Sequence, residues 1–560
     1  MTQPVGVVLG TREKQAEALE FWVAVEDEAY LQLDDVVYVQ TPLPGKEHET
    51  VTFYGTVQFV TRFFEGIPFD SDTKRAAQGI LPVHLTYAAN ISITRVIPSI
   101  FIPPRPGDPV FRAEGRRLQE GLFVDRMAAR LPAGILRTGD PYYLNYDFIS
   151  GQNGAHVSIS GVSGIATKTT YATFLLYSIM HSGVLEGEQA NTRAIIFNVK
   201  GEDLLFLDRR NANLPPEEEA KYEALGLPVS AFESVNLYAP ARPASDALLP
   251  STERRRTGIT PYMWTLRQVA KERLFSFLFA ESGEEFSSLL QLIRIVENAL
   301  ASAAKDGKGD EEPVVSPTGA LLTDLFELYE DISNDEAKWF GAFPRHQGQV
   351  NAFLRRLHNA AFQTRGLIRR APKESKKPKY RIDWQEKQVT VVDIHTLTAA
   401  AKMFVVGALI KTIFREKEEQ GTAHPHVFVL LDELNKYAPR EGFSPIQDVL
   451  LDVAERGRSL GVILIGAQQT ASEVEPRIFS NCAIRVAGRM DSAEVEHKEY
   501  GFLGPIFRKR ARIISPGTMI VHQPDVPTPI LLTFPFPAWA TRPEEVDRAA
   551  TGKQEDPFDF

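Results

Sequence analysis

A small-residue loop in the middle of the chain places a lysine and a threonine where they could bind phosphate. The segment Gly161-Val-Ser-Gly-Ile-Ala-Thr-Lys-Thr169 lies between an apolar, strand-like run over 156–160 and a helical pattern that begins at Thr170. A phosphate-binding loop needs inward-pointing backbone amides, a lysine for the outer phosphates, a hydroxyl for Mg²⁺ and a helix N-terminus behind them. Lys168 and Thr169 supply the lysine and the hydroxyl.

The glycines of this loop depart from the usual pattern. That pattern has one glycine directly before the lysine and another six residues before it, and these positions hold Thr167 and Val162. On these residues alone, a phosphate loop and an ordinary strand-to-helix turn remain equally open. Because Thr167 has less access to positive φ than glycine, we expect nucleotide affinity or turnover to be low or to depend on a partner. The predicted phosphate-binding residues are Gly161, Ser163, Gly164, Ala166, Thr167, Lys168, Thr169 and Thr170.

Two adjacent carboxylates follow a second apolar run, Val427-Phe-Val-Leu-Leu-Asp-Glu433. A buried strand seldom ends in two acids, because the second charge must be desolvated for a reason. Asp432 could hold a Mg²⁺-bound water, and Glu433 could polarise an attacking water. The alternative interpretation is a helix N-cap at the strand exit.

A third apolar run, Val462-Ile-Leu-Ile-Gly-Ala-Gln-Gln469, ends in amides. An amide beside a nucleotide can sense a γ-phosphate, because it both donates and accepts hydrogen bonds. Taken alone, the segment is more readily interpreted as a simple turn. In order after the other two features, Gln468 becomes a candidate sensor.

The elements that must position these residues can be read from the apolar pattern. Strand-like runs cover 156–160, 194–199, 389–393, 427–431 and 462–465, and helical patterns separate several of them. Runs this apolar are typical of strands buried on both faces, which predicts a parallel sheet covered by helices. Residues from about 260 to 365 are mainly helical in pattern, which predicts an insertion within this α/β domain.

The first 115 residues have a different sequence pattern. Short runs at 5–9, 20–25, 36–40, 51–58 and 90–97 are rich in β-branched and aromatic residues. Closely spaced runs of this kind predict a small all-β barrel or sandwich. The stiff segment Pro103-Pro-Arg-Pro-Gly-Asp-Pro109 then indicates a domain exit.

The order of these motifs resembles the HerA/FtsK superfamily of hexameric DNA-pumping ATPases, and HerA most closely. The resemblance is most specific from 427 to 495. It is carried there by Leu-Leu-Asp-Glu-Leu434, Glu455-Arg-Gly-Arg-Ser-Leu-Gly461, the Gly-Ala-Gln-Gln469 strand, Phe479-Ser-Asn-Cys482 and Arg485-Val-Ala-Gly-Arg489. The fold that it implies is a RecA-like P-loop ATPase core with a helical insertion, preceded by a HAS-type β-barrel.

The resemblance also implies cofactors and site residues. ATP and Mg²⁺ would be bound, Thr169 and Asp432 would hold the metal, and the catalytic residues would be Lys168, Glu433, Gln468, Arg489 and Arg485. In this superfamily an arginine from a neighbouring subunit reaches the γ-phosphate. Arg489 or, earlier on the same strand-like run, Arg485 matches that position. The alternative for Arg489 is an ion pair with Asp491 or Glu494 on its own surface.

Five regions follow from pattern and resemblance together. Residues 1–115 are the barrel, 116–255 the first part of the core with the phosphate loop, 256–370 the helical insertion, 371–540 the second part of the core and 541–560 a C-terminal tail. A chain of 560 residues is long enough for two or three domains.

Composition limits the class of protein. Neither an apolar stretch of membrane-spanning length nor a secretory signal is visible, so we expect no membrane association. The single cysteine, Cys482, excludes an internal disulfide framework and a cysteine-built zinc site, so we expect a cytoplasmic protein.

Charge limits how the chain could bind nucleic acid. The net charge of −10 argues against a basic surface that wraps nucleic acid, but it allows a local basic channel. Two basic clusters could line such a channel, although solvated loops are the alternative interpretation. They are Arg369, Arg370, Lys373, Lys376, Lys377, Lys379 and Arg381, and then Arg508, Lys509, Arg510 and Arg512.

These observations predict an ATP-hydrolysing homo-hexamer that acts as a translocase or helicase, with double-stranded DNA in its pore and a nuclease or effector docked through the barrel. The alternative is a ring scaffold with slow hydrolysis. HerA-like variants in bacterial antiviral defence are paired with sirtuin-like NADases or nucleases, which such a scaffold would assemble and regulate. A peptide-unfolding ATPase would use the same core chemistry, but the chain has no evident aromatic–glycine gripping loop.

Overall fold

The computed structural model describes residues 3–67, 69–162, 168–243, 248–279, 286–341, 347–372, 380–442 and 444–546. The chain packs into two units, one made of residues 1–146 with 500–534 and the other of 147–499 with 535–560. The division does not follow chain order, because each unit includes a segment from the C-terminal part of the chain. None of the described helices has both the length and the hydropathy that a membrane span requires.

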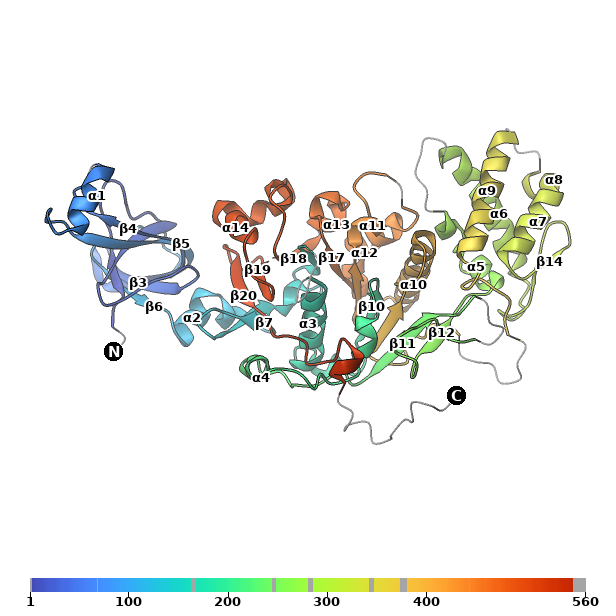
Figure 1. Cartoon of the computed structure of the whole chain (residues 1–560), viewed down its shortest axis with the longest axis horizontal. Coiled ribbons are helices and arrows are strands. Elements are labelled where there is room, and N and C mark those ends of the chain that lie inside the picture. Colours follow the sequence, from blue (N-terminus) through green and yellow to red (C-terminus); the bar gives the residue numbers. More distant parts are fainter. Residues whose placement is uncertain are drawn as a thin grey trace. The chain divides into compact units, whose positions relative to one another are not determined.

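The N-terminal residues form a closed barrel (Figure 1). Its strands pair antiparallel in the order β1-β2-β5-β4-β3-β6. Side chains alternate along them, as in β2, where Phe21, Val23 and Val25 point into the core. The predicted all-β barrel is therefore confirmed. The strands are β1 (Gly6–Val8), β2 (Glu20–Val25), β3 (Val36–Leu43), β4 (Lys46–Phe64), β5 (Leu85–Ile97) and β6 (Pro109–Arg112).

Further elements complete this unit. Arg510 on α14 donates to both carboxylate oxygens of Asp34 at 2.6 Å, and Arg137 pairs with Asp35. These ion pairs fasten the barrel to its neighbouring elements. The remaining elements are α1 (Asp70–Ala77), α2 (Arg116–Gly121), α14 (Gly504–Ala511) and the antiparallel strands β7 (Arg130–Ile135), β8 (Pro141–Asn145), β19 (Thr518–His522) and β20 (Ile530–Thr533).

A parallel sheet forms the centre of the second unit. Its strand order is β12-β11-β15-β10-β16-β17-β9-β18, and every neighbouring pair is parallel. All residues of β9, β15, β16 and β17 are buried, as their apolar runs predicted. The strands are β9 (Ala155–Ser160), β10 (Arg193–Asn198), β11 (Val235–Pro240), β12 (Thr260–Tyr262), β15 (Val389–Asp393), β16 (Val427–Asp432), β17 (Val462–Gln468) and β18 (Cys482–Ala487).

Helices cover this sheet. The helix α3 packs against β9, β16 and β17, and α12 packs against β17 and α10. The helix α10 ends at Gly421, whose φ of 67° is a left-handed conformation that favours glycine. The helices are α3 (Lys168–His181), α4 (Pro216–Ala224), α10 (Ala399–Gln420), α11 (Leu434–Tyr437), α12 (Gln447–Leu460) and α13 (Pro476–Ser480).

The segment between β12 and β15 is mainly helical, as predicted. Its apolar side chains, such as Phe277 and Phe353, belong to the same buried cluster as Val405 of α10 and Leu464 of β17. The insertion therefore shares the core of the α/β domain instead of forming its own. Its elements are α5 (Leu266–Lys271), α6 (Phe286–Ala303), α7 (Leu325–Asn334), α8 (Glu336–Phe340), α9 (Gln347–Gln363) and the short hairpin of β13 (Val314–Val315) with β14 (Leu321–Leu322).

Candidate nucleotide-binding site

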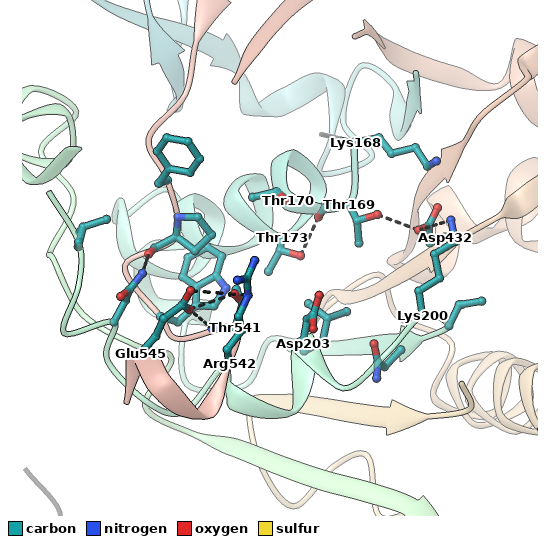
Figure 2. A pocket seen from close by; sticks show the side chains of 18 of the residues that line it. Lys168, Thr169, Thr170, Thr173, Lys200, Asp203, Asp432, Thr541, Arg542 and Glu545 are labelled. Atoms are coloured by element: carbon teal, nitrogen blue, oxygen red, sulfur yellow. Dashed lines mark hydrogen bonds and ion pairs between the residues drawn. The ribbon is translucent and has the colours of Figure 1, made fainter. Parts of the chain in front are cut away.

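The carboxyl ends of β9, β17 and β16 lie side by side in the parallel sheet. The register pairs Gln468 with Ser160 and Asp432 with Ala467, so the three sequence features end at one sheet edge. The carboxyl edge of a parallel sheet is where α/β proteins bind ligands. The Thr169 hydroxyl donates a hydrogen bond to Asp432 Oδ2 at 2.7 Å, across 263 residues of sequence (Figure 2).

Lys168 is the first residue of α3, and its side chain is only 2% exposed. Burial lowers the pKa of its ammonium group, while the carboxylates of Asp432 and Glu433 oppose that shift. The nearby Lys200 lowers the pKa further. A helix N-terminus that already carries a desolvated cation is a strong site for an anion, because the helix dipole adds to the charge.

Four of the predicted loop residues, Ser163, Gly164, Ala166 and Thr167, lie outside the described residues. The entrance to the loop is described. The Gly161 amide donates to the carbonyl of Gln468 at 3.2 Å, and the Val162 amide donates to the carbonyl of Arg489 at 2.8 Å. The loop therefore leaves β9 between the ends of β17 and β18.

Glu433 follows β16 with φ 58° and ψ 39°, a left-handed conformation that is uncommon for a residue with a side chain. Its amide donates to Asp432 Oδ1 at 2.7 Å. Lys200 lies 3.1 Å from Glu433 Oε1, and Lys436 lies 2.8 Å from Oε2. Burial alone would raise the pKa of Glu433, but the hydrogen bonds from Lys436 and Lys200 outweigh it and lower the pKa. Glu433 is therefore held ionised, with a cation at each oxygen.

A cavity of about 650 Å³ opens beside these residues. At one end it is bordered by Lys168, Thr169 and Asp432, and the first turns of α3 contribute Thr170 and Thr173 (Figure 2). Lys200 also lines it, between Asp432 and the end of β10. The side chains of one cavity thus include both metal candidates and two lysines.

The far end of the cavity is built by the C-terminal segment, whose sequence pattern does not predict a place near the site. Trp539, Arg542 and Glu545 line the cavity there. The segment is fixed by Tyr222 on α4, whose hydroxyl donates to the Phe536 carbonyl at 2.9 Å and accepts from the Ala538 amide at 3.0 Å. The sequence signal for this wall was weak, because an aromatic–proline segment near a chain end has many structural uses.

Gln468 is fully buried within the sheet. Its side-chain amide donates to Ser158 Oγ at 2.7 Å and to Ser160 Oγ at 2.9 Å. Its Oε1 has no hydrogen-bond partner among the described residues, so the side chain keeps an acceptor. The structure thus gives Gln468 a structural role on β9 in addition to the predicted sensor role.

The two candidate arginines differ in their surroundings. Arg485 is half-buried on β18 and lies over the ring of Phe479, 5.0 Å from its centroid. Arg489 is exposed, and no ion pair involves it among the described residues. The carboxylates proposed as its alternative partners are engaged elsewhere, since Asp491 accepts from the Ala493 amide and Glu494 from Ser472. The backbone of Arg489 thus contacts Val162 at the described start of the loop, while its side chain is exposed.

Two other acidic residues at this edge have structural partners. Asp393, at the end of β15, accepts from Asn198 at 2.8 Å and lies 2.9 Å from His395 Nδ1. The hydrogen bond to Asp393 raises the pKa of His395. Glu202 accepts three backbone amides from residues 253–255. Both carboxylates therefore stabilise the loops that border the site.

Mg²⁺ fits the residues present. The Thr169 hydroxyl and the Asp432 carboxylate already meet, and Mg²⁺ in phosphate sites is held by few protein oxygens together with water and substrate phosphates. Among the described residues no group of three or more His, Cys, Asp or Glu side chains could hold a metal by itself. Thr169 and Asp432 would hold the ion, which would neutralise phosphate charge.

Three solved structures are distantly similar to parts of this chain. VirB4 of Thermoanaerobacter pseudethanolicus is 14% identical over 73% of this chain and 96% of its own, with a TM-score of 0.43. Plasmid coupling protein TrwB, in complex with the non-hydrolysable ATP analogue ADPNP, is 12% identical to this chain, with a TM-score of 0.47. That match covers 78% of this chain and 96% of the TrwB chain. The genome packaging NTPase B204 from Sulfolobus turreted icosahedral virus 2, in complex with ATP-gammaS, covers 26% of this chain and 68% of its own at 12% identity and a TM-score of 0.21.

No protein-family model matches the chain, and no curated protein matches it in sequence. The strand order, with β17 between the loop strand β9 and the carboxylate strand β16, and the separate barrel define a RecA-like P-loop fold with an N-terminal β-barrel. The predicted fold class is confirmed.

Proposed function

We propose that this chain is an ATP-hydrolysing ring motor that translocates double-stranded DNA. The observation that carries the ATPase assignment is the hydrogen bond between Thr169 and Asp432 in a cavity that Lys168 also lines. This is the set of groups that a phosphate-binding loop and a metal-binding strand tip must bring together. Lys168 binds the outer phosphates, and Thr169 and Asp432 hold Mg²⁺.

Glu433 is the group that activates water in this proposal. The water oxygen attacks the γ-phosphorus, the bond from that phosphorus to the β,γ-bridging oxygen breaks, and Glu433 accepts the water proton. The products are ADP and inorganic phosphate, and the proton passes on to solvent. The lowered pKa of Glu433 keeps it in the ionised form that this step requires.

A homo-hexamer supplies the second half of the site. In this proposal the exposed Arg489, which follows the sensor strand in sequence, reaches the γ-phosphate of a neighbouring subunit. This assignment rests on the motif resemblance and on the free state of the guanidinium among the described residues. Gln468, through its unpartnered Oε1, reports on the γ-phosphate or the attacking water.

Double-stranded DNA occupies the pore in this proposal. Arg508, Lys509 and Arg510 lie on α14, and Arg510 is paired with Asp34. Part of the other basic cluster, residues 373–379, lies outside the described residues, and Arg381 is paired with Glu272. If basic side chains track phosphates, DNA affinity falls steeply with salt and shows little base preference.

The barrel docks the partner nuclease or effector. Phe59 and Phe63 of β4 are partly exposed, and Trp22 packs edge-on against Phe59 with ring centroids 6.2 Å apart. Exposed aromatic groups of this kind are typical of protein interaction surfaces. Deleting the barrel would leave Arg510 without Asp34, so Phe59→Ser with Phe63→Ser is a cleaner test of docking than truncation.

The alternative is a ring scaffold that assembles and regulates an effector enzyme in antiviral defence, with slow hydrolysis in the cytoplasm. The observation that favours it is the pairing of both Glu433 oxygens with lysines, which holds the water-activating group in an engaged state. Steady-state ATP hydrolysis with and without double-stranded DNA separates the two functions. Stimulation by DNA supports the motor, whereas a slow rate that DNA does not change supports the scaffold.

A further inference from the structure

Lys200 is brought to the candidate site by the sheet register. It lies two residues beyond β10, and β10 pairs with β16 so that Phe197 is opposite Leu431. Continuing both strands therefore brings Lys200 close to Asp432 and Glu433. Its Nζ lies 3.1 Å from Glu433 Oε1 and 3.8 Å from Asp432 Oδ2, the oxygen that also accepts the Thr169 hydroxyl.

A surface ion pair is the simplest interpretation of these contacts, and such pairs contribute little to stability. Lys436 fits that interpretation, because its side chain is 64% exposed, its only ion pair among the described residues is with Glu433 Oε2, and it does not line the cavity. Lys200 differs on each point. It is less exposed at 45%, it reaches both carboxylates, and it lines the cavity together with Lys168.

Lys168, Lys200 and Asp432 line this end of the cavity. Glu433 follows Asp432 and pairs with Lys200 on one oxygen and with Lys436 on the other. A Mg²⁺–nucleoside triphosphate complex carries net negative charge, so its arrival beside the two carboxylates requires a cation to turn toward the phosphates. Lys168 meets part of that need from the helix N-terminus. Lys200, on a flexible and half-exposed stem, is the cavity-lining cation that can move from carboxylate to phosphate.

We propose that Lys200 is a second phosphate-binding cation of this site, which pairs with Glu433 when no nucleotide is bound and contacts the outermost phosphate of a bound nucleoside triphosphate. The proposal rests on the nucleotide-binding function proposed above. It also explains how Glu433 is released, because transfer of Lys200 to the phosphate frees Oε1 to accept the water proton. Lys200 belongs to the same subunit as Lys168, so this role is separate from that of Arg489.

Binding measurements with nucleotides that differ in the outermost phosphate test this proposal. The dissociation constants of the Mg²⁺ complexes of ADP and of a non-hydrolysable ATP analogue are measured by calorimetry on the full chain. Lys200→Ala should weaken binding of the analogue by roughly 10-fold or more, which is the usual scale for a lost charge-assisted hydrogen bond. The dissociation constant for ADP should stay within about 3-fold of the parental value. Lys200→Arg should retain most of the affinity for the analogue.

Lys436→Ala is the matched control, because it removes a cation from the other oxygen of the same carboxylate. It should leave the ratio of the two dissociation constants unchanged. The proposal would be overturned if Lys200→Ala lost affinity equally for ADP and the analogue, or lost affinity for neither. It would also be overturned if Lys436→Ala lost the same affinity for the analogue as Lys200→Ala. Failure of the parental chain to bind either nucleotide would instead contradict the nucleotide-binding function itself. A thermal unfolding midpoint without nucleotide confirms that each variant is folded.

Discussion

The hydroxyl of Thr169 and the carboxylate of Asp432 meet at 2.7 Å although 263 residues separate them in the chain. The contact joins the start of α3 to the end of β16, and it brings together the two protein oxygens that suit Mg²⁺. Thr169→Ala should therefore raise the Mg²⁺ concentration needed for half-maximal ATP hydrolysis by roughly 10-fold or more. Thr169→Ser keeps the hydroxyl and should stay near the parental value. A Mg²⁺ titration that is identical for both variants would contradict the metal assignment.

Gln468 should contribute to stability as well as to chemistry. Replacing it with leucine leaves the Ser158 and Ser160 hydroxyls without their donor, and we expect the free energy of unfolding to fall by about 1–3 kcal/mol. Chemical denaturation measures that loss. The double variant Ser158→Ala with Ser160→Ala removes both hydrogen-bond partners. Adding Gln468→Leu to it should therefore lower the free energy of unfolding clearly less than Gln468→Leu does in the parental chain. Strict additivity would show that these hydrogen bonds contribute nothing.

The sequence predicted the barrel, the parallel sheet and the three strand-tip features, because each depends on local pattern. Val427–Asp432 is apolar until its last residue, and that pattern alone indicates a buried strand that ends at a site. Lys200 was not predicted, because its proximity to Glu433 depends on which strands become neighbours, and strand order is not encoded locally. The wall formed by Trp539 and Arg542 was not predicted either, because its segment is held by Tyr222 of α4, more than 300 residues away in sequence.

The variant Arg489→Ala tests whether the active site is shared between subunits. Arg489→Ala should assemble and bind ATP yet hydrolyse it about 10³-fold more slowly, the usual scale for an arginine finger. Mixed with Lys168→Ala subunits, it should regain activity at interfaces where an intact loop meets an intact arginine. The Arg489 carbonyl accepts from Val162 of its own loop, so action within one subunit is the competing outcome. Mixtures that stay inactive would indicate that Arg489 acts within its own subunit. Full activity of Arg489→Ala would make Arg485 the candidate instead.

Stability should depend on pH through His156. Burial lowers the pKa of His156 to about 4, from an ordinary value near 6.5, and its Nδ1 accepts the Leu464 amide at 2.9 Å. Between these values the unfolded chain binds the proton and the folded chain does not. Stability is therefore complete above pH 6.5 and falls with decreasing pH by at most about 1.4 kcal/mol per unit for this group.

The matched variant for this prediction is His156→Asn. Asparagine tolerates the φ of 66° at this position and retains a hydrogen-bond acceptor, but it does not titrate. Denaturation curves from pH 7 to pH 4.5 should show a shallower loss of stability in the variant than in the parental chain. Parallel pH profiles would mean that His156 does not control this transition.

We expect the cavity between α3 and β16 to bind and hydrolyse ATP, and measurements of nucleotide binding and turnover in three chains test this. The parental chain should bind and hydrolyse ATP, and Lys168→Ala should lose affinity because a buried cation no longer meets the phosphates. Glu433→Gln should bind ATP with affinity close to the parental value and release almost no phosphate, since water activation alone is removed. Hydrolysis by Glu433→Gln at the parental rate would show that Glu433 does not activate the attacking water.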